Sequence, residues 1–413
     1  MTVDIVSAVG RVDAAYVRRV LGRLVDVASP TGSEEAVARV YQEEMRALGL
    51  ATELQEVEPG RPNAIGRWAG SGGGRSVLFD GHLDTSFGGV EPELTGPGYA
   101  TRLTEEEDVY VGMGTFNMKG ALAAYLGAVR ALMDDGFEPA GDVTVAGVVG
   151  EIEKAPVGRF QGAAYRGYGR GTQYLIGHGL RADWAVLGEP TGLEIVRGHF
   201  GTIWVRLTVA GDVIHTAWSE GRANAIESMG RVLSLVEAWK PGFCARTSHE
   251  GLPAIVNIAA IEGGWPWRAA RTPSDCRLYL DVRGPPAFTP SDLDRELREI
   301  EVKAGGGLRH DFYVTEPGTE IPADHPLVTS LSDAHASTLG ARPSVGFVRW
   351  YSDAALLNRF GVPTINYGPS GRLPGGGVGF SVPRGEYLSR ADLLDGTRVY
   401  AAWLARATSG DGG

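Results

Sequence analysis

Cysteine is scarce in this sequence, and basic residues are outnumbered by acidic ones. The 413 residues include only two cysteines, Cys244 and Cys276, which form neither a disulfide framework nor a C-x-x-C pair. Lysine and arginine total 39 against 50 aspartates and glutamates, so the formal net charge is −11. Because nucleic acids and anionic membranes attract basic surfaces, this balance argues against either partner and favours a small-molecule substrate.

Long apolar runs are also missing. No segment approaches the roughly 18 uninterrupted apolar residues of a membrane-spanning helix. Residues 1–16 lack the basic stretch and apolar stretch of a secretory signal. We therefore expect a cytoplasmic protein with no membrane partner. Hydrophobic residues make up 43% of the chain and charged residues 22%, which is an ordinary globular balance, and the length allows two domains with sizeable cores.

Apolar strands alternate with helices in the first half of the chain. Residues 76–86, 142–153 and 183–191 each indicate a buried strand that runs into a loop, and the apolar spacing over 119–136 predicts a helix. This alternation predicts an α/β fold with a mostly parallel sheet flanked by helices. Ligands of such sheets bind beyond the carboxyl ends of the strands. Four candidate functional residues lie at these ends: His82, Asp84, Glu151 and Glu189.

From about residue 199 the pattern changes. A strand, a helix, further strands, a second helix and a last strand follow one another, which predicts a small α+β domain with one open sheet. From about residue 318 the α/β pattern returns, and it ends in a helix over 390–407. The second domain is therefore predicted to be inserted into the first. The glycine-rich run at 371–379 is a loop candidate.

A series of short motifs runs in order through nearly the whole chain. The longest are GHLDTS at 81–86, GMGTFNMKG at 112–120, VVGEIE at 148–153, LGEPT at 187–191 and IHTAWSEGRANAIE at 214–227. Together they resemble the acetylornithine deacetylase, succinyl-diaminopimelate desuccinylase and aminoacylase family of zinc amidohydrolases. The resemblance implies a zinc-peptidase-like α/β domain over 1–197 and 318–413. It also implies an inserted α+β lid and dimerisation domain over 198–317, and hence a homodimer.

The resemblance also assigns chemistry to individual residues. In that family two zinc ions share a bridging aspartate, and a glutamate takes the proton of the zinc-bound water that attacks an amide. On this basis Glu151 is the general base, Asp84 orients the ring of His82, and Glu189 is a metal ligand together with His82. Asn117 stands at the bridging position and is at best a weak oxygen ligand.

Further residues match positions that contact substrate in the family. His215 resembles the histidine that family dimers contribute across their interface to polarise the substrate carbonyl. Arg283 is able to clamp a substrate carboxylate with two parallel hydrogen bonds. Asn257 and His199 are the remaining candidates for substrate binding.

The metal-binding pattern is broken at three points. Asn117 replaces the bridging aspartate, so this position carries no negative charge. Ile152 replaces the second of the paired glutamates. No histidine follows His335, although the family has a ligand histidine near the C-terminus. One metal position is therefore predicted to be empty, and the other retains His82 and Glu189.

A nearby carboxylate offers a possible substitute for the lost glutamate. Glu153 would face the same way as Glu151 if the chain were extended here, because residues two apart share a face of a strand. The simpler interpretation is that Glu153 is a solvated partner of Lys154.

Three functional hypotheses follow. The first is an amide hydrolase for a small N-acyl amino acid or peptide-like substrate, with one zinc ion at most. The second is a metal-free enzyme that uses the same pocket for acyl transfer, cyclisation or elimination on an amino-acid derivative, with Glu151, His82 and His215 as acids and bases. The third is a non-catalytic binding protein. The sequence contains no serine-hydrolase elbow or phosphate-binding glycine loop that would indicate another chemistry.

Overall fold

The computed structural model describes residues 9–371 and 384–409 and divides the chain into two compact units. The first unit comprises Met1–Arg197, Ile321–Gly346 and Ser352–Gly413, and the second comprises Gly198–Glu320 and Phe347–Tyr351. The chain thus returns to the first unit three residues later than the sequence pattern predicts, because β15 (Thr319–Glu320) still pairs with the end of β8 (Ile195–His199). Except for Gly371, the loop expected at 371–379 lies outside the described residues.

Most strands of the first unit belong to a nine-stranded mixed sheet. Its order is β1-β2-β6-β3-β7-β17-β8-β15, and β16 also pairs with β8. The four central strands β6, β3, β7 and β17 are parallel, whereas the outer pairings are antiparallel. The predicted α/β class is confirmed, with parallel pairing confined to the centre of the sheet. Besides β8 and β15, the strands of this sheet are β1 (Ala51–Glu58), β2 (Arg61–Trp68), β3 (Val77–His82), β6 (Val143–Val148), β7 (Trp184–Leu187), β16 (Val345–Val348) and β17 (Thr364–Asn366).

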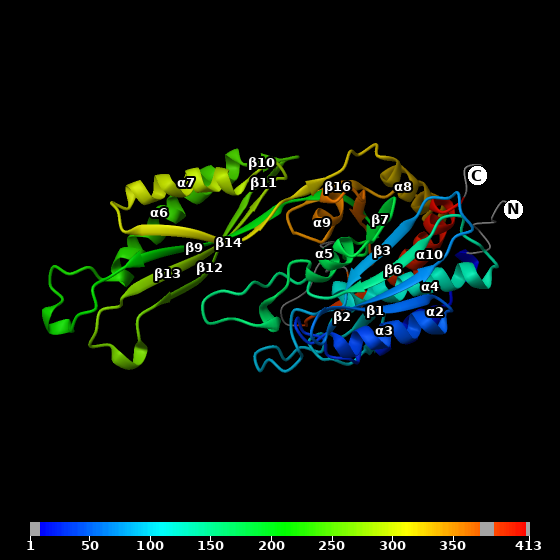
Figure 1. Ribbon diagram of the computed structural model, residues 1–413, viewed down its shortest axis with the longest axis horizontal. Helices are drawn as coiled ribbons and strands as arrows, with labels where there is room; N and C mark the ends of the chain where they lie inside the picture. Colours follow the sequence, from blue (N-terminus) through cyan, green and yellow to red (C-terminus); the bar gives the residue numbers. More distant parts are fainter. Residues whose placement is uncertain (1–8, 372–383, 410–413) are drawn as a thin grey trace. The chain divides into compact units, whose positions relative to one another are not determined.

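Helices cover both faces of this sheet (Figure 1). Because side chains alternate along a strand, β3 directs Phe79 into one core and Leu78 into the other, and both are fully buried. The core of Phe79 is shared with α2 (Ala14–Val25), α3 (Glu35–Ala47), α4 (Gly120–Asp134), α8 (Pro326–Leu339) and α10 (Arg390–Ala407). The core of Leu78 is shared with α5 (Arg170–Gly177) and α9 (Ala354–Arg359).

A small three-stranded sheet joins distant parts of the first unit. Its order is β18-β5-β4, from β4 (Thr104–Glu106), β5 (Val109–Val111) and β18 (Tyr387–Ser389). The pairing of Tyr387 with Val111 brings the C-terminal segment beside the chain that leads into η1 (Thr115–Lys119). Asn117 lies within η1. The short η2 segment spans Ala163–Tyr165.

The second unit is built on a four-stranded antiparallel sheet. Its order is β12-β13-β9-β14, with α6 and α7 on one face, as Figure 1 shows. Val205 and Leu207 of β9 are buried against these helices, whereas the alternating residues of β9 face the other way. Within the described residues, no helix is both long enough and apolar enough to cross a bilayer. The elements are β9 (Gly201–Ala210), η3 (Thr216–Trp218), α6 (Ala225–Arg246), β10 (Ser248–His249), β11 (Leu252–Pro253), β12 (Ile255–Gly263), η4 (Pro266–Arg268), β13 (Asp275–Gly284), α7 (Pro290–Lys303) and β14 (Leu308–Glu316).

Candidate active site

Three side chains of the metal-binding type meet at one edge of the large sheet. His82 ends β3, Glu151 follows β6 by three residues, and Glu189 follows β7 by two. Because these strands are adjacent and parallel, their carboxyl ends lie together. One ligand atom from each residue lies within 4.8 Å of the others, and all three side chains are buried.

The ring of His82 is fixed by a main-chain carbonyl. Its Nδ1 atom lies 2.8 Å from the carbonyl oxygen of Asp84, which only accepts, so Nδ1 carries the proton. The Nε2 atom lies 3.0 Å from Asn117 Oδ1 and 3.8 Å from Glu151 Oε2. Asn117 Oδ1 is an acceptor, and so is Glu151 Oε2 when its carboxyl is ionised. The Nε2 atom therefore calls for a cation between itself and these oxygens, or for a second proton on the ring.

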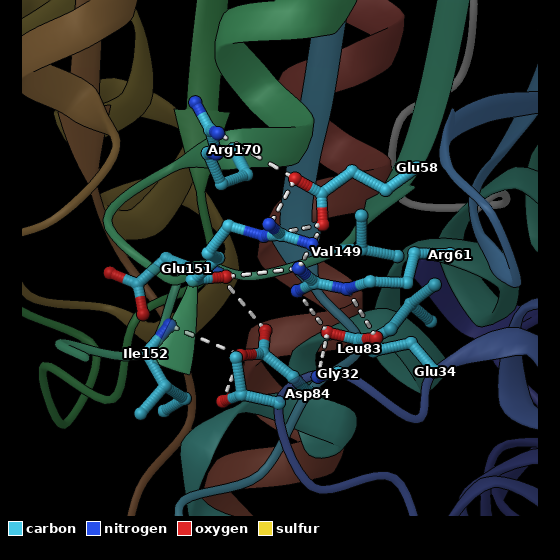
Figure 2. A network of polar contacts seen from close by, with 12 residues as sticks. Gly32, Glu34, Glu58, Arg61, Leu83, Asp84, Val149, Glu151, Ile152 and Arg170 are labelled. Atoms are coloured by element: carbon cyan, nitrogen blue, oxygen red, sulfur yellow. Dashed lines mark hydrogen bonds and ion pairs between the residues drawn. The ribbon is translucent and has the colours of Figure 1, made fainter. Parts of the chain in front are cut away.

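The carboxylate of Asp84 has a different task from the one that we expected. It lies 3.6 Å from His82 Nδ1, too far for a hydrogen bond to the ring. It instead accepts the main-chain N–H groups of Glu151 at 3.1 Å and Ile152 at 3.2 Å (Figure 2). It also accepts the Thr31 hydroxyl at 2.8 Å. Asp84 thus orients the ring through its carbonyl and holds the main chain of Glu151 through its carboxylate.

Burial and mutual repulsion disturb the titration of these groups. Burial, together with the charges of Glu189 and Asp353, raises the pKa of Glu151 well above its ordinary value. Burial also raises the pKa of Glu189, although His82 opposes this. Burial alone would lower the pKa of His82, but Glu189 and Asp84 outweigh it and the pKa is raised. Adjacent buried carboxyls of this kind require a cation or a shared proton.

The donors at this edge fit one metal ion. The Oε1 atom of Glu189 is buried and has no hydrogen-bond partner, and a buried oxygen of this kind is costly unless a cation satisfies it. With His82 Nε2 and Asn117 Oδ1 it makes a nitrogen and oxygen donor set of the type that zinc accepts. Ile152 is buried and contributes only hydrocarbon beside this set. Among the described residues, His82, Glu151 and Glu189 form the one fully buried group of possible metal ligands.

Glu386 supports the segment that carries Asn117, a role that the sequence did not predict. Its Oε2 atom accepts the main-chain N–H groups of Gly114 at 3.0 Å, Phe116 at 3.2 Å and Asn117 at 3.1 Å. Burial raises its pKa to about 7, and these three N–H groups limit the rise. The one feature of the sequence that could have indicated this role is the position of Glu386 directly before β18.

Glu153 does not share the position of Glu151. The strand β6 ends at Val148, and residues 151–153 lie in a turn, so the two-residue repeat of extended chain does not apply. Glu153 is only half-buried, whereas Glu151 is buried.

The candidates for substrate binding lie in the second unit. Arg283 already has a carboxylate partner, because its Nε and Nη2 atoms lie 2.9 Å from Asp281 oxygens. Asp281 also accepts the hydroxyl of Thr202 at 3.0 Å, and it pairs across the strands with the exposed Asn257. A substrate carboxylate would therefore have to compete with Asp281 for Arg283.

The two histidines of this unit that the sequence singled out, His199 and His215, differ in exposure. His199 is fully buried, its Nδ1 atom donates to the carbonyl of Phe200 at 2.9 Å, and its ring packs edge-on against Tyr351. His215 is half-buried at the start of η3, where its Nδ1 atom accepts the N–H of Ala217 at 3.1 Å. A second group of possible metal ligands, His249, Glu250 and Glu320, is half-buried to exposed.

The α/β sheet, the second unit inserted into its sequence and the buried histidine–glutamate site are those of a metallohydrolase scaffold. Residues 78–406 match peptidase family M20/M25/M40. The chain belongs to this family, and it is a hydrolase of the family's deacylase and peptidase type.

Curated relatives match most of the chain. The N-formyl-4-amino-5-aminomethyl-2-methylpyrimidine deformylase of Bacillus subtilis is 25% identical over 380 residues, which is 83% of each chain. The acetylornithine deacetylase of Salmonella arizonae is 30% identical over 336 residues, 78% of this chain and 79% of its own. The solved structure of the di-peptidase Dug1p from Saccharomyces cerevisiae has a TM-score of 0.76 at 13% identity and covers 99% of both chains, which is a likeness of fold.

Proposed function

We propose that this protein hydrolyses the amide bond of a small N-acyl amino acid or peptide-like substrate, with one divalent metal ion at most. The observation that carries the proposal is the convergence of His82, Glu151 and Glu189. The nitrogen and oxygen atoms that meet there, among them His82 Nε2 and Glu189 Oε1, have no hydrogen-bond donor between them. The relatives give independent support, because their names describe removal of formyl and acetyl groups and cleavage of dipeptides.

Each residue at the site has a definite role in this proposal. His82 and Glu189 would hold the metal ion, with Asn117 Oδ1 as a weaker third donor. A bound divalent ion polarises a substrate carbonyl and lowers the pKa of a bound water. Glu151 takes the proton of the attacking water and returns it to the departing nitrogen, so the amide becomes a carboxylate and an amine. Its raised pKa suits a group that both accepts and donates near neutral pH.

The second unit supplies the remaining roles in this proposal. His215 of a second copy would donate a hydrogen bond to the substrate carbonyl, since His215 is half-buried and its ring is not enclosed by its own unit. Arg283, Asn257 and His199 would contact the rest of the substrate. Homodimerisation through this unit and a cytoplasmic location remain predictions.

A metal-free reaction is the second candidate. The lone pair of His82 Nε2 can bind a proton instead of a metal ion. The raised pKa of His82 favours the imidazolium. The neutral Asn117 favours this reading, because a bridging aspartate would compete better for a dication. His82 would then act as an acid and Glu151 as a base on an amino-acid derivative.

Metal analysis combined with an activity assay distinguishes the two candidates. Protein purified without chelators would be assayed on N-acetyl-L-ornithine, other N-acetyl and N-formyl amino acids and dipeptides, before and after removal of metal. We expect at most one zinc per chain, loss of hydrolysis on chelation, and recovery when zinc is restored. Full activity without metal supports the second candidate, and two equivalents of zinc contradict a single-ion site.

A variant of the base tests the catalytic reading directly. Glu151→Gln keeps the size of the side chain and removes the carboxylate, so we expect hydrolysis to fall by about 100-fold or more. Glu153→Gln is the matched control, because it removes a neighbouring carboxylate that is only half-buried. Equal activity of both variants and the unaltered protein would exclude Glu151 as the base.

A further inference from the structure

A fully buried arginine lies behind the loop that carries Glu151. The Nε and Nη2 atoms of Arg61 donate to the two carboxylate oxygens of Glu34 at 2.9 and 2.6 Å, in a fork-to-fork arrangement. The Nη1 atom donates to Glu58 at 2.9 Å and to the carbonyl of Arg166 at 3.0 Å. Arg61 and Glu34 are both 0% exposed, so this ion pair is sealed from water.

The guanidinium also packs directly against the residue before the proposed base. A Cβ atom on Gly150 would lie 2.6 Å from Arg61 Nη2, so any other residue here would displace the guanidinium. Gly150 has a φ of +66°, a left-handed conformation that glycine adopts freely. Arg61 therefore limits the movement of Gly150, the residue that directly precedes Glu151. Figure 2 shows Arg61 between Glu34, Glu58 and this loop.

The partner of Arg61 is tied to the other side of the same loop. Glu34 accepts the N–H of Gly32 at 3.0 Å, and the neighbouring Thr31 donates its hydroxyl to Asp84. Asp84 in turn accepts the N–H groups of Glu151 and Ile152. The loop is thus held at Gly150 by Arg61, and one residue later by Asp84.

Stability alone is a poor explanation for this arrangement. Removing two charges from water is costly, and well-packed apolar residues often replace a buried ion pair without loss of stability. A planar guanidinium with fixed donors does provide a defined position, which an apolar side chain does not.

We propose that Arg61 and Glu34 are positioning residues that hold Glu151 in its reactive place. The proposal rests on the proposed function, since it presumes that Glu151 is the base. Within residues 9–371 and 384–409, no hydrogen bond or ion pair joins His82 or Glu189, which would hold the metal ion, to Arg61 or Glu34. Disturbing the pair should therefore affect turnover more than metal binding or substrate affinity.

The test uses Glu34→Gln and Arg61→Lys in the full-length, zinc-loaded protein. Arg61→Lys keeps the positive charge but loses the pair of parallel hydrogen bonds to Glu34. It should therefore preserve folding better than a neutral residue would. Because a displacement of about 1 Å can cost about 100-fold in rate, we expect kcat to fall about 10- to 100-fold in both variants. We expect KM to change less than about threefold and zinc content to stay unaltered, since substrate and metal contacts are not touched.

Glu44→Gln is the matched control. Glu44 lies on α3, ten residues after Glu34, is 1% exposed, and pairs with Arg19 at 2.7 Å. The side chain of Arg19 is 50% exposed, so Glu44→Gln removes a buried carboxylate from an ion pair that is open to water on one side. The pair lies away from the site, and kcat of Glu44→Gln should equal that of the unaltered protein. Hydrogen exchange at the amides of Glu151 and Ile152 adds a readout that needs no substrate, and it should accelerate in Glu34→Gln but not in Glu44→Gln.

The outcomes separate this inference from the proposed function. Unaltered kcat and unaltered exchange in Glu34→Gln and Arg61→Lys, with an inactive Glu151→Gln, would overturn the positioning role alone. An equal loss of kcat in Glu44→Gln would also overturn it, since the effect would be general. Full activity of Glu151→Gln would overturn the proposed function, and the positioning role with it.

Discussion

His82 Nε2 and Asn117 Oδ1 lie 3.0 Å apart, although neither atom has a hydrogen to donate when the ring is neutral. The proton on Nδ1 is committed to the carbonyl of Asp84, so the lone pair of Nε2 faces the oxygen of Asn117. An aspartate at this position would add a negative charge next to a bound cation. The neutral amide thus leaves a site that needs a cation but attracts it less strongly.

Restoring that charge should strengthen metal binding. Asn117→Asp places a carboxylate beside His82 and Glu189, and we expect zinc affinity to rise about tenfold or more, which corresponds to ~1.4 kcal/mol. Competition with a chromophoric chelator measures the change. Asn257→Asp adds the same charge at an exposed position of the second unit and should leave zinc affinity unaltered. An unchanged affinity in Asn117→Asp would exclude this position as part of the metal site.

The pH dependence of hydrolysis should reflect the environment of Glu151. Burial and the nearby carboxylates raise its pKa, so it stays protonated at pH values where an ordinary glutamate, with a pKa of about 4.3, is ionised. A protonated carboxyl cannot act as a base. We therefore expect kcat/KM to fall as the pH is lowered through the raised pKa, about tenfold per pH unit on the acid side. A profile that is flat down to pH 5 would contradict this assignment.

A buried acid pair beneath the site makes a prediction about stability. The Thr172 hydroxyl lies 3.1 Å from Asp80 Oδ2 and 2.5 Å from Asp353 Oδ2. A hydroxyl donates one hydrogen, so one of the two carboxyls must itself carry a proton. Burial raises the pKa of Asp80 to about 7. The protonated carboxyl stabilises the fold below about pH 4, and this contribution is lost as the pH rises to about 7.

Asp80→Asn removes the contribution of Asp80 to this dependence on pH, while Asp353, whose pKa burial also raises, remains. The amide cannot ionise, so the variant should gain stability relative to the unaltered protein as the pH rises from 5 to 8, by about 2 kcal/mol. Urea unfolding of metal-free protein at both pH values measures the difference. Asp324→Asn changes an exposed carboxyl and should show no such gain. A constant difference between the two pH values would mean that Asp80 is ionised throughout.

The sequence located the fold and the strand-end residues better than the contacts between them. Periodic apolar residues predicted the last helix at 390–407, which is where α10 lies. Apolar strands likewise predicted His82, Glu151 and Glu189 at the carboxyl ends of one sheet. These features are local and repeat along the chain, so a single sequence records them.

Contacts between distant charged residues left no such record. Arg61 and Glu34 are 27 residues apart, and the sequence around each is typical of an exposed charged residue. In the structure both side chains are completely buried. The task of the Asp84 carboxylate depends on N–H groups 67 and 68 residues away. Only the folded chain shows which carboxylate faces which donor.

Mixed dimers test whether His215 acts on the site of a second copy. His215→Ala and Glu151→Gln should each be nearly inactive as pure proteins. If the histidine acts between copies, a dimer of the two variants contains one site with an intact Glu151 and an intact His215 from its partner. Mixing the unfolded variants and refolding them should then restore about a quarter of the unaltered activity, since half of the dimers are mixed and each has one complete site. If His215 serves the site of its own chain, no mixed dimer contains a complete site, and the mixture stays inactive.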